Sequence, residues 1–171
     1  MGDTQDVKGE AFMQALDPLL PIGYRLAFAM LRNRNEAEDV VQDAALNAWG
    51  HRDSFRAGNP MRPWFLAIVA NQCRQAVRTK WWSVVRRPDL ASGSTAESER
   101  GQDDTEGLKR GLLKLNDRDR LVLVLRYYLD MSFDDVASTL HISSQAARVR
   151  THRALARLRP FMDVPGELND E

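Results

Sequence analysis

The stretch SFDDVASTLHISSQAARVRTHRALARLR, residues 132–159, decides the fold of the second half of the chain. Apolar residues recur at helical spacing on both sides of a short break at 141–143, so we expect two helices, at 133–140 and 144–159. Ser132 stands where a side chain would cap the first of them. Two short helices joined by three residues, the second one basic, are typical of a helix-turn-helix motif.

The predicted motif has an inner and an outer face. The apolar inner face consists of Phe133, Val136, Ala137, Leu140, Ile142, Ala147, Thr151, Ala154 and Leu158. The outward set on the second helix is Gln145, Arg148, Val149, His152 and Arg153. These side chains suit the major groove of DNA, where arginine forks onto guanine and shorter side chains contact base edges or thymine methyl groups. An ordinary helical hairpin with a solvated basic face is the alternative that the pattern leaves open.

The net charge of the 171-residue chain is zero, but the charges are unevenly distributed. Residues 61–87 carry six basic and no acidic side chains, and residues 142–160 carry five basic and none acidic. A purely basic stretch is the electrostatic footprint of a polyanion contact, because each Lys or Arg near a phosphate displaces a condensed counterion. Two solvated helix faces are the plainer interpretation of the same charges.

Residues 88–105, PDLASGSTAESERGQDDT, separate the two basic stretches. This segment is rich in Ser, Gly, Asp and Glu, and its apolar content is too low to offset the entropy of ordering it. It therefore reads as a flexible acidic linker. We predict an all-α protein of two small helical domains, at 7–87 and 106–162, joined by this linker, the second domain containing the helix-turn-helix.

Helical patterns also fill the first domain. Asp17 followed by proline predicts a helix cap and first turn, and Asn35 with Glu38 has the spacing of a capping box. The apolar stripe that follows consists of Ala37, Val40, Val41, Ala44 and Ala48. No segment alternates with the period of two that marks a half-buried strand.

A Gly- and Pro-bearing loop at 54–63 precedes a long predicted helix at about 64–81. In the second domain, helices are expected at 106–115 and 118–129 ahead of the helix-turn-helix, with Asp117 as the cap of the second.

Several classes of protein are excluded or disfavoured by composition. The single cysteine, Cys73, cannot form an internal disulfide, leaves no CxxC zinc site, and lies in an apolar run that predicts a core position. No run reaches the length of about 18 apolar residues that spans a bilayer, and the acidic N-terminus is unlike a secretory signal, so a cytoplasmic protein is expected. The three histidines are scattered and no catalytic motif is present. We expect no enzyme activity, no catalytic residues, no metal and no cofactor.

Taken together, these stretches resemble the extracytoplasmic-function (ECF) sigma factors of the sigma-70 family. EAEDVVQDAALNAW, residues 36–49, is similar to the polymerase-binding helix of region 2, typically AEDLVQEVFLRAW. SFRAGNPMRPWFLAIVANQCRQAVR, residues 54–78, is similar to the promoter-melting loop and helix. Residues 132–159 match the region 4 pattern SYEEIAEILGIPVGTVKSRLHRARERL in register without a gap. The resemblance covers roughly residues 10–160.

The resemblance implies a role for each surface. Core polymerase binding falls to Glu38, Asp39, Gln42 and Asp43, for which a solvated face is the alternative. Contact with the melted −10 element falls to Arg56, Arg62, Asn71, Arg74, Arg78 and Lys80. Contact with the −35 element falls to Arg126, Gln145, Arg148, Val149, His152 and Arg153. Trp64 reads as a core residue rather than a stacking platform for a base, and the sequence does not decide the roles of Trp81 and Trp82.

The family implies a promoter-directing initiation factor whose partners are core RNA polymerase, promoter DNA and an anti-sigma factor. The alternative is a stand-alone helix-turn-helix regulator with an N-terminal protein-interaction domain, but such a regulator needs no second basic surface like that from Arg56 to Lys80. His141 departs from the usual glycine at a position that favours a left-handed backbone, and Ala67 replaces a common basic residue. Arg150 falls toward the adjacent helix, so a scaffold ion pair and a DNA contact are equally open roles for it.

Overall fold

The computed structural model describes residues 3–56, 58–86 and 103–162, and in these ranges it contains helices and no strand. The N-terminal lobe consists of α1 (Asp3–Leu16), the 3-10 turn η1 (Asp17–Leu19), α2 (Leu20–Leu31), α3 (Arg34–Gly50), the 3-10 turn η2 (Arg52–Ser54) and α4 (Met61–Arg86). The C-terminal lobe consists of α5 (Asp103–Lys114), α6 (Asp117–Leu123), the π-helix η4 (Val124–Tyr128), α7 (Phe133–Leu140), α8 (Ser144–Leu158) and the 3-10 turn η5 (Arg159–Phe161). The all-α prediction is confirmed.

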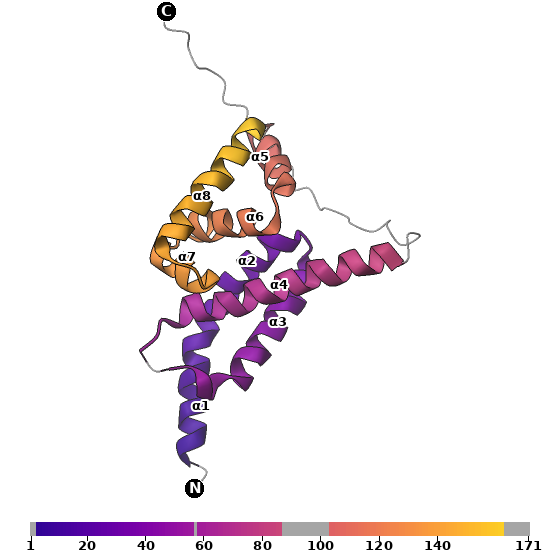
Figure 1. Ribbon diagram of the computed structural model, residues 1–171. Coiled ribbons are helices and arrows are strands. Elements are labelled where there is room, and N and C mark those ends of the chain that lie inside the picture. The colour runs from indigo at the N-terminus through magenta and orange to yellow at the C-terminus, as the bar shows by residue number, and fades with distance from the viewer. Residues whose placement is uncertain (1–2, 57, 87–102, 163–171) are drawn as a thin grey trace, which may run out of the picture.

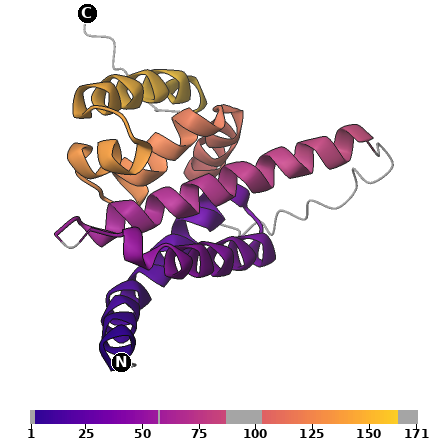
Figure 2. The ribbon, with the colours of Figure 1, turned by 60° about the horizontal axis from the view of Figure 1, so that its bottom comes forward.

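Helix α4 crosses the middle of the molecule and separates the other elements (Figure 1). The C-terminal lobe lies along one side of α4, with α1 and α3 on the other, and Figure 2 shows the same order from a second direction. Helix α7 packs against α4, while α2 packs against α6 and η4. The predicted promoter-melting helix therefore lies directly beside the first helix of the predicted helix-turn-helix.

The core of the N-terminal lobe forms where α2, α3 and α4 meet. Leu26, Phe65 and Val69 are completely buried there, and each such side chain contributes about 1.5–3 kcal/mol when it leaves water. Helix α2 approaches α4 closely at Gly23, because a Cβ atom at that position would lie 2.9 Å from the Phe65 ring. The predicted stripe on α3 is confirmed, since Ala37, Val40, Val41, Ala44 and Ala48 are all buried.

Two helices are capped by a residue that precedes the predicted one. Helix α3 is capped by Asn33, whose side chain accepts a hydrogen bond from the Glu36 amide at 3.1 Å, rather than by Asn35. Helix α6 is capped by Asn116, which accepts from the Asp119 amide at 2.9 Å, rather than by Asp117. Both helices begin earlier than the polar pattern suggests, and the residue preceding the first turn takes the capping role.

Other element boundaries also differ from the prediction. Asp17 makes no side-chain cap, because α1 and η1 lead without a break toward α2. The long helix α4 begins at Met61 and ends at Arg86, beyond both ends of the predicted 64–81. Pro63, the last residue of the predicted loop, lies in the first turn of α4, where a missing N–H costs nothing. The predicted helix at 118–129 divides into α6 and η4, in which the Leu129 amide donates to the Val124 carbonyl at 2.9 Å.

The helix-turn-helix matches the prediction closely. Helix α7 has the predicted bounds, and the Ser132 side chain accepts from the Asp135 amide at 3.1 Å. His141 ends α7 in the left-handed conformation, with φ 54° and ψ 46°. Ser143 caps α8 in the same way that Ser132 caps α7, by accepting from the Ala146 amide. Of the predicted linker at 88–105, residues 88–102 lie outside the described ranges, and its last three residues already belong to α5.

Three arginines join the two lobes by donating to main-chain carbonyls at or near helix ends. Arg25 of α2 donates to the Tyr128 carbonyl at 3.0 Å, and Arg62 of α4 donates to the Leu129 carbonyl at 2.6 Å. In the opposite direction, Arg120 of α6 donates to the Met30 carbonyl at 3.2 Å. The last carbonyls of a helix have no intrahelical partner and carry partial negative charge, so cations suit them. We call this packing of the lobes the closed arrangement.

Candidate polymerase and nucleic-acid interfaces

The outer face of α3 concentrates carboxylate and amide groups. The predicted polymerase-binding residues on it are Glu38, Asp39, Gln42 and Asp43, and all four are exposed. They share one side of α3 because the opposite side is buried against α2 and α4. The face is therefore accessible for a basic partner surface.

An exposed leucine, which the sequence patterns above did not single out, lies among these polar groups. Leu46 is 71% exposed and follows Gln42 by one helical turn. Trp49, one turn nearer the end of α3, is 37% exposed and supports the Arg52 guanidinium 4.4 Å above its ring. Leu46 could have been found from the sequence, since it falls outside the apolar stripe of α3.

The loop ahead of α4 is anchored by an aromatic cluster. The Trp64 ring lies 5.0 Å from that of Phe55 and 6.1 Å from that of Phe12, measured between centroids. Phe12 is buried and Trp64 half-buried, which agrees with the interpretation of Trp64 as a packing residue. Arg56, just beyond the cluster, is exposed.

The predicted −10 residues of α4 fall into two groups. Asn71, Arg74 and Arg78 are exposed along one side, where Arg74 donates to the Asn71 side chain. Arg62 is half-buried under the C-terminal lobe, bonded to the Leu129 carbonyl. The side chain of Lys80 lies outside the described part of the structure. In the closed arrangement, Arg62 is thus engaged within the protein and is not presented to DNA.

The predicted −35 residues of α8 form a continuous outer surface. Exposed on it are Gln145, Arg148, Val149, His152 and Arg153, while the inner residues Ala147, Thr151, Ala154 and Leu158 are buried. Both the outward set and the inner face of α8 are as predicted.

Two of the −35 candidates make contacts inside the lobe. The Arg148 guanidinium lies 4.6 Å from the centre of the Phe133 ring, and Arg126 lies 5.0 Å from the same ring. Arg126 also donates to the Met131 carbonyl at 2.8 Å and pairs with Asp130 at 3.8 Å. Arg148 remains exposed at the surface, whereas Arg126 is half-buried.

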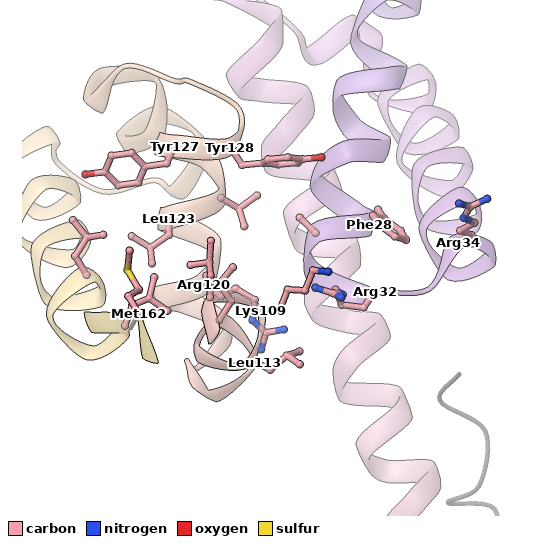
Figure 3. A pocket seen from close by; sticks show the side chains of 16 residues that line it. Phe28, Arg32, Arg34, Lys109, Leu113, Arg120, Leu123, Tyr127, Tyr128 and Met162 are labelled. Atoms are coloured by element: carbon pink, nitrogen blue, oxygen red, sulfur yellow. The ribbon is translucent and has the colours of Figure 1, made fainter. Parts of the chain in front are cut away.

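A largely apolar cavity of about 780 Å³ lies between the lobes. Figure 3 shows Phe28 of α2 on one wall, with Leu123, Tyr127 and Met162 of the C-terminal lobe opposite. Basic side chains at the cavity are Arg32, Arg34, Lys109 and Arg120. The half-exposed tyrosines make this the kind of apolar patch that marks a binding surface.

Two family models match the chain, Sigma-70 region 2 over residues 4–83 and Sigma-70, region 4 over residues 111–160. The chain belongs to the sigma-70 family. The N-terminal lobe is thus region 2 and the C-terminal lobe region 4. The alternative of a stand-alone regulator is not favoured, because it does not account for region 2.

The curated relatives and solved structures place the chain in the ECF group. It is 32% identical to the RNA polymerase sigma factor CarQ of Myxococcus xanthus over 83% of this chain and 82% of that one. It is 27% identical to the ECF RNA polymerase sigma factor SigW of Bacillus subtilis over 88% of each chain. Among solved structures, the sigma factor RpoE of Bartonella quintana, in complex with the anti-sigma factor NepR, matches with a TM-score of 0.76 and 26% identity over 92% of this chain and 99% of that one.

As an ECF sigma factor, the protein binds core RNA polymerase and directs it to promoter DNA. Sigma factors are initiation factors and not catalysts themselves. Among the described residues, no group of three or more His, Cys, Asp or Glu side chains is placed to hold a metal ion. None of the helices in the described ranges is long and apolar enough to cross a membrane.

Proposed function

We propose that this sigma factor carries out initiation in the cytoplasm with three separate surfaces. The outer face of α3 binds core polymerase, the loop and exposed side of α4 hold the melted −10 strand, and the outer face of α8 reads the −35 duplex. The observation that carries the proposal is that the polymerase-binding set lies on one side of α3 and the five −35 residues of α8 lie on one side of that helix, with the opposite side of each helix buried. On α4, Asn71, Arg74 and Arg78 are exposed along one side.

Polymerase binding by α3 combines charge with one apolar anchor. Carboxylates at an interface steer association and set specificity more than they add affinity. Leu46 supplies the apolar area that charges lack, and at 71% exposure most of that area is available to a partner. The acidic and amide side chains around it then form the polar surroundings of a small hydrophobic contact.

The closed arrangement has to open before both promoter elements are bound. As their names indicate, the −10 and −35 elements lie about 25 base pairs apart, or about 85 Å along a duplex at about 3.4 Å per base pair. Helix α4 contacts α7, and α7 contacts α8, so the two DNA-reading helices are far closer than that in the closed arrangement. Opening also releases Arg62 from the Leu129 carbonyl.

The cavity between the lobes suits an anti-sigma factor. Its lining is apolar, and its basic side chains favour acidic ones on the partner. An amphipathic helix with one apolar and one acidic face fits both features. The Bartonella relative, whose structure was solved with an anti-sigma factor, supports this assignment by similarity.

The assignment of α3 is tested with the double variant Asp39→Arg, Gln42→Ala. We expect it to lose co-elution with core polymerase and run-off transcription, because a positive charge then faces a basic partner surface. Helical circular dichroism should be unchanged, since both side chains are exposed.

A matched control is Asp17→Arg with Gln14→Ala, which makes the same changes at exposed positions outside α3. It should bind core polymerase as the parent chain does. Equal binding by the two double variants would show that α3 is not the polymerase-binding surface.

A further inference from the structure

A second groove between the lobes, about 790 Å³ in volume, is lined mainly by charged side chains, and four of them are arginines. Region 2 contributes Arg74 and Arg78 from α4, and region 4 contributes Arg118 from α6 and Arg150 from α8. Arginines of both regions thus line one groove in the closed arrangement.

The positive charge of this groove is not neutralised within the protein. In the described ranges, the side chains of Arg78, Arg118 and Arg150 make no hydrogen bond or ion pair, and the Arg74 side chain bonds only to the neutral groups of Asn71 and Ala70. The scaffold ion pair, one of the two roles open to Arg150, is therefore absent from the described structure, although the residue is half-buried.

The two carboxylates at the groove are already paired with arginines outside its lining. Asp117 pairs with Arg120 at 3.2 Å, and the buried Asp119 pairs with Arg157 and accepts from Asn116. Four guanidinium groups consequently repel one another across the junction of the lobes, and an anion of comparable charge would relieve that repulsion.

The lining also limits the kind of anion. Guanidinium groups bind phosphate oxygens in a bidentate manner, and all four basic groups of the lining are arginines, with no lysine. Apart from the arginines and the two paired aspartates, the lining consists of Val77 and Asn116, so it offers no aromatic surface for stacking a base. The volume is typical of a small-molecule site.

We infer that this groove binds an oligophosphate, a linear chain of three or more phosphate groups, either free or as part of a nucleotide. By bridging arginines of both regions, the ligand stabilises the closed arrangement. The inference rests on the proposed function in one respect, because Arg74 and Arg78 are also the residues assigned to −10 phosphates; a bound oligophosphate therefore competes with promoter DNA.

Isothermal titration calorimetry on the full chain tests the site with inorganic tripolyphosphate, GTP and orthophosphate in separate titrations. We expect one molecule of tripolyphosphate per chain and at least tenfold weaker binding of orthophosphate. Equal affinity for GTP and tripolyphosphate would identify the phosphate chain as the recognised element, and tighter binding of GTP would identify a nucleotide. Orthophosphate binding as tightly as tripolyphosphate would overturn the inference.

The variant Arg118→Gln, Arg150→Gln removes the region 4 half of the groove and leaves the assigned DNA and polymerase residues intact. Tripolyphosphate should bind it at least tenfold more weakly. The matched control is Arg110→Gln, Arg159→Gln, two exposed arginines of the same lobe outside the groove, which should change affinity less than threefold. Equal weakening by the two variants would mean non-specific charge attraction and would overturn the inference.

A single-stranded DNA oligonucleotide of 12 nucleotides, the 12-mer, serves as the competing ligand. If the 12-mer loses affinity for the groove variant but tripolyphosphate does not, the groove takes a nucleic-acid backbone and the inference is wrong. Because these titrations use the free chain, they are independent of run-off transcription by the parent protein, so a failure of either proposal is recognised separately. Circular dichroism of both variants confirms that they fold.

Discussion

Replacing Arg25 by alanine tests whether the closed arrangement depends on the contacts between the lobes. Arg25 donates to the Tyr128 carbonyl at 3.0 Å, and its guanidinium lies 4.7 Å from the centre of the Tyr128 ring. It belongs to none of the three surfaces assigned to polymerase or DNA. The substitution therefore changes the equilibrium between closed and open lobes without removing a functional contact.

The size of the effect follows from these two contacts. A hydrogen bond from a charged donor contributes about 1.5–3 kcal/mol, less at an exposed site such as this one. The cation–π contact contributes about 0.5–1 kcal/mol when exposed. Together we expect Arg25→Ala to destabilise the closed arrangement by about 1–2 kcal/mol, which lowers the ratio of closed to open molecules by a factor of about 5–30.

Energy transfer between dyes on the two lobes measures this ratio. Exposed labelling sites are available at Gln14 in α1 and Ala156 in α8, each replaced by cysteine, while the buried Cys73 stays unlabelled. We expect lower transfer efficiency in Arg25→Ala than in the parent chain. If only the open form binds core polymerase, apparent affinity for core rises by up to the same factor.

Arg110→Ala is the control, because Arg110 is equally exposed and lies outside the bonds that join the lobes. It should leave transfer efficiency at the parent value. The reasoning fails if Arg25→Ala and Arg110→Ala give the same transfer efficiency as the parent chain, since the contacts of Arg25 would then contribute nothing to closure.

Three other predictions concern the −35 reader, the buried thiol and the packing of α5. In binding selections on randomised −35 duplexes, Arg148→Ala should lose about 1–3 kcal/mol of binding free energy and relax the preference at one base pair. Arg153→Ala should weaken binding to all sequences alike and lower the salt slope by about one. Unchanged profiles in both variants would exclude α8 as the reader. Burial raises the pKa of Cys73 from 9.0 to about 12, so the unfolded chain loses this proton at a lower pH than the folded chain does. The free energy of unfolding, measured in urea, should therefore fall between pH 9 and 11 in the parent chain and fall less in Cys73→Ala. Parallel curves for the two proteins would contradict this. A Cβ atom at Gly107 would lie 2.5 Å from the Phe161 carbonyl oxygen, whereas a Cβ atom at Gly50 would meet nothing within 4 Å. Gly107→Ala should therefore lower the melting temperature by an amount equivalent to about 1–3 kcal/mol, and Gly50→Ala should not. Equal melting temperatures of the two variants would refute the close packing at Gly107.

Local patterns were sufficient for the helix-turn-helix. The bounds of α7, the cap at Ser132 and the left-handed His141 all depend on residues within one or two turns of each other. The outer faces of α3 and α8 were predictable for the same reason, because the 3.6-residue period places each polar set opposite an apolar stripe. The same period also places Leu46 outside the apolar stripe, so its exposure could have been predicted from the sequence.

Helix boundaries depended on neighbours that the local pattern does not reveal. Helix α3 is capped by Asn33 and α6 by Asn116, and the sequence pattern did not distinguish them from nearby polar residues because Asn, Asp and Ser have similar capping preference. The division of the predicted helix 118–129 into α6 and η4 likewise accompanies its packing against α2.

The sequence by itself determined that the chain is helical, which faces of α3 and α8 are buried, and which side chains these two helices expose. Only the tertiary structure decided that regions 2 and 4 pack together, that Arg62 is bonded to the Leu129 carbonyl, and that arginines of both regions meet in one groove. The physical reason is that these contacts join residues more than 35 positions apart, through side chains and carbonyl groups whose pairing leaves no periodic mark in the sequence.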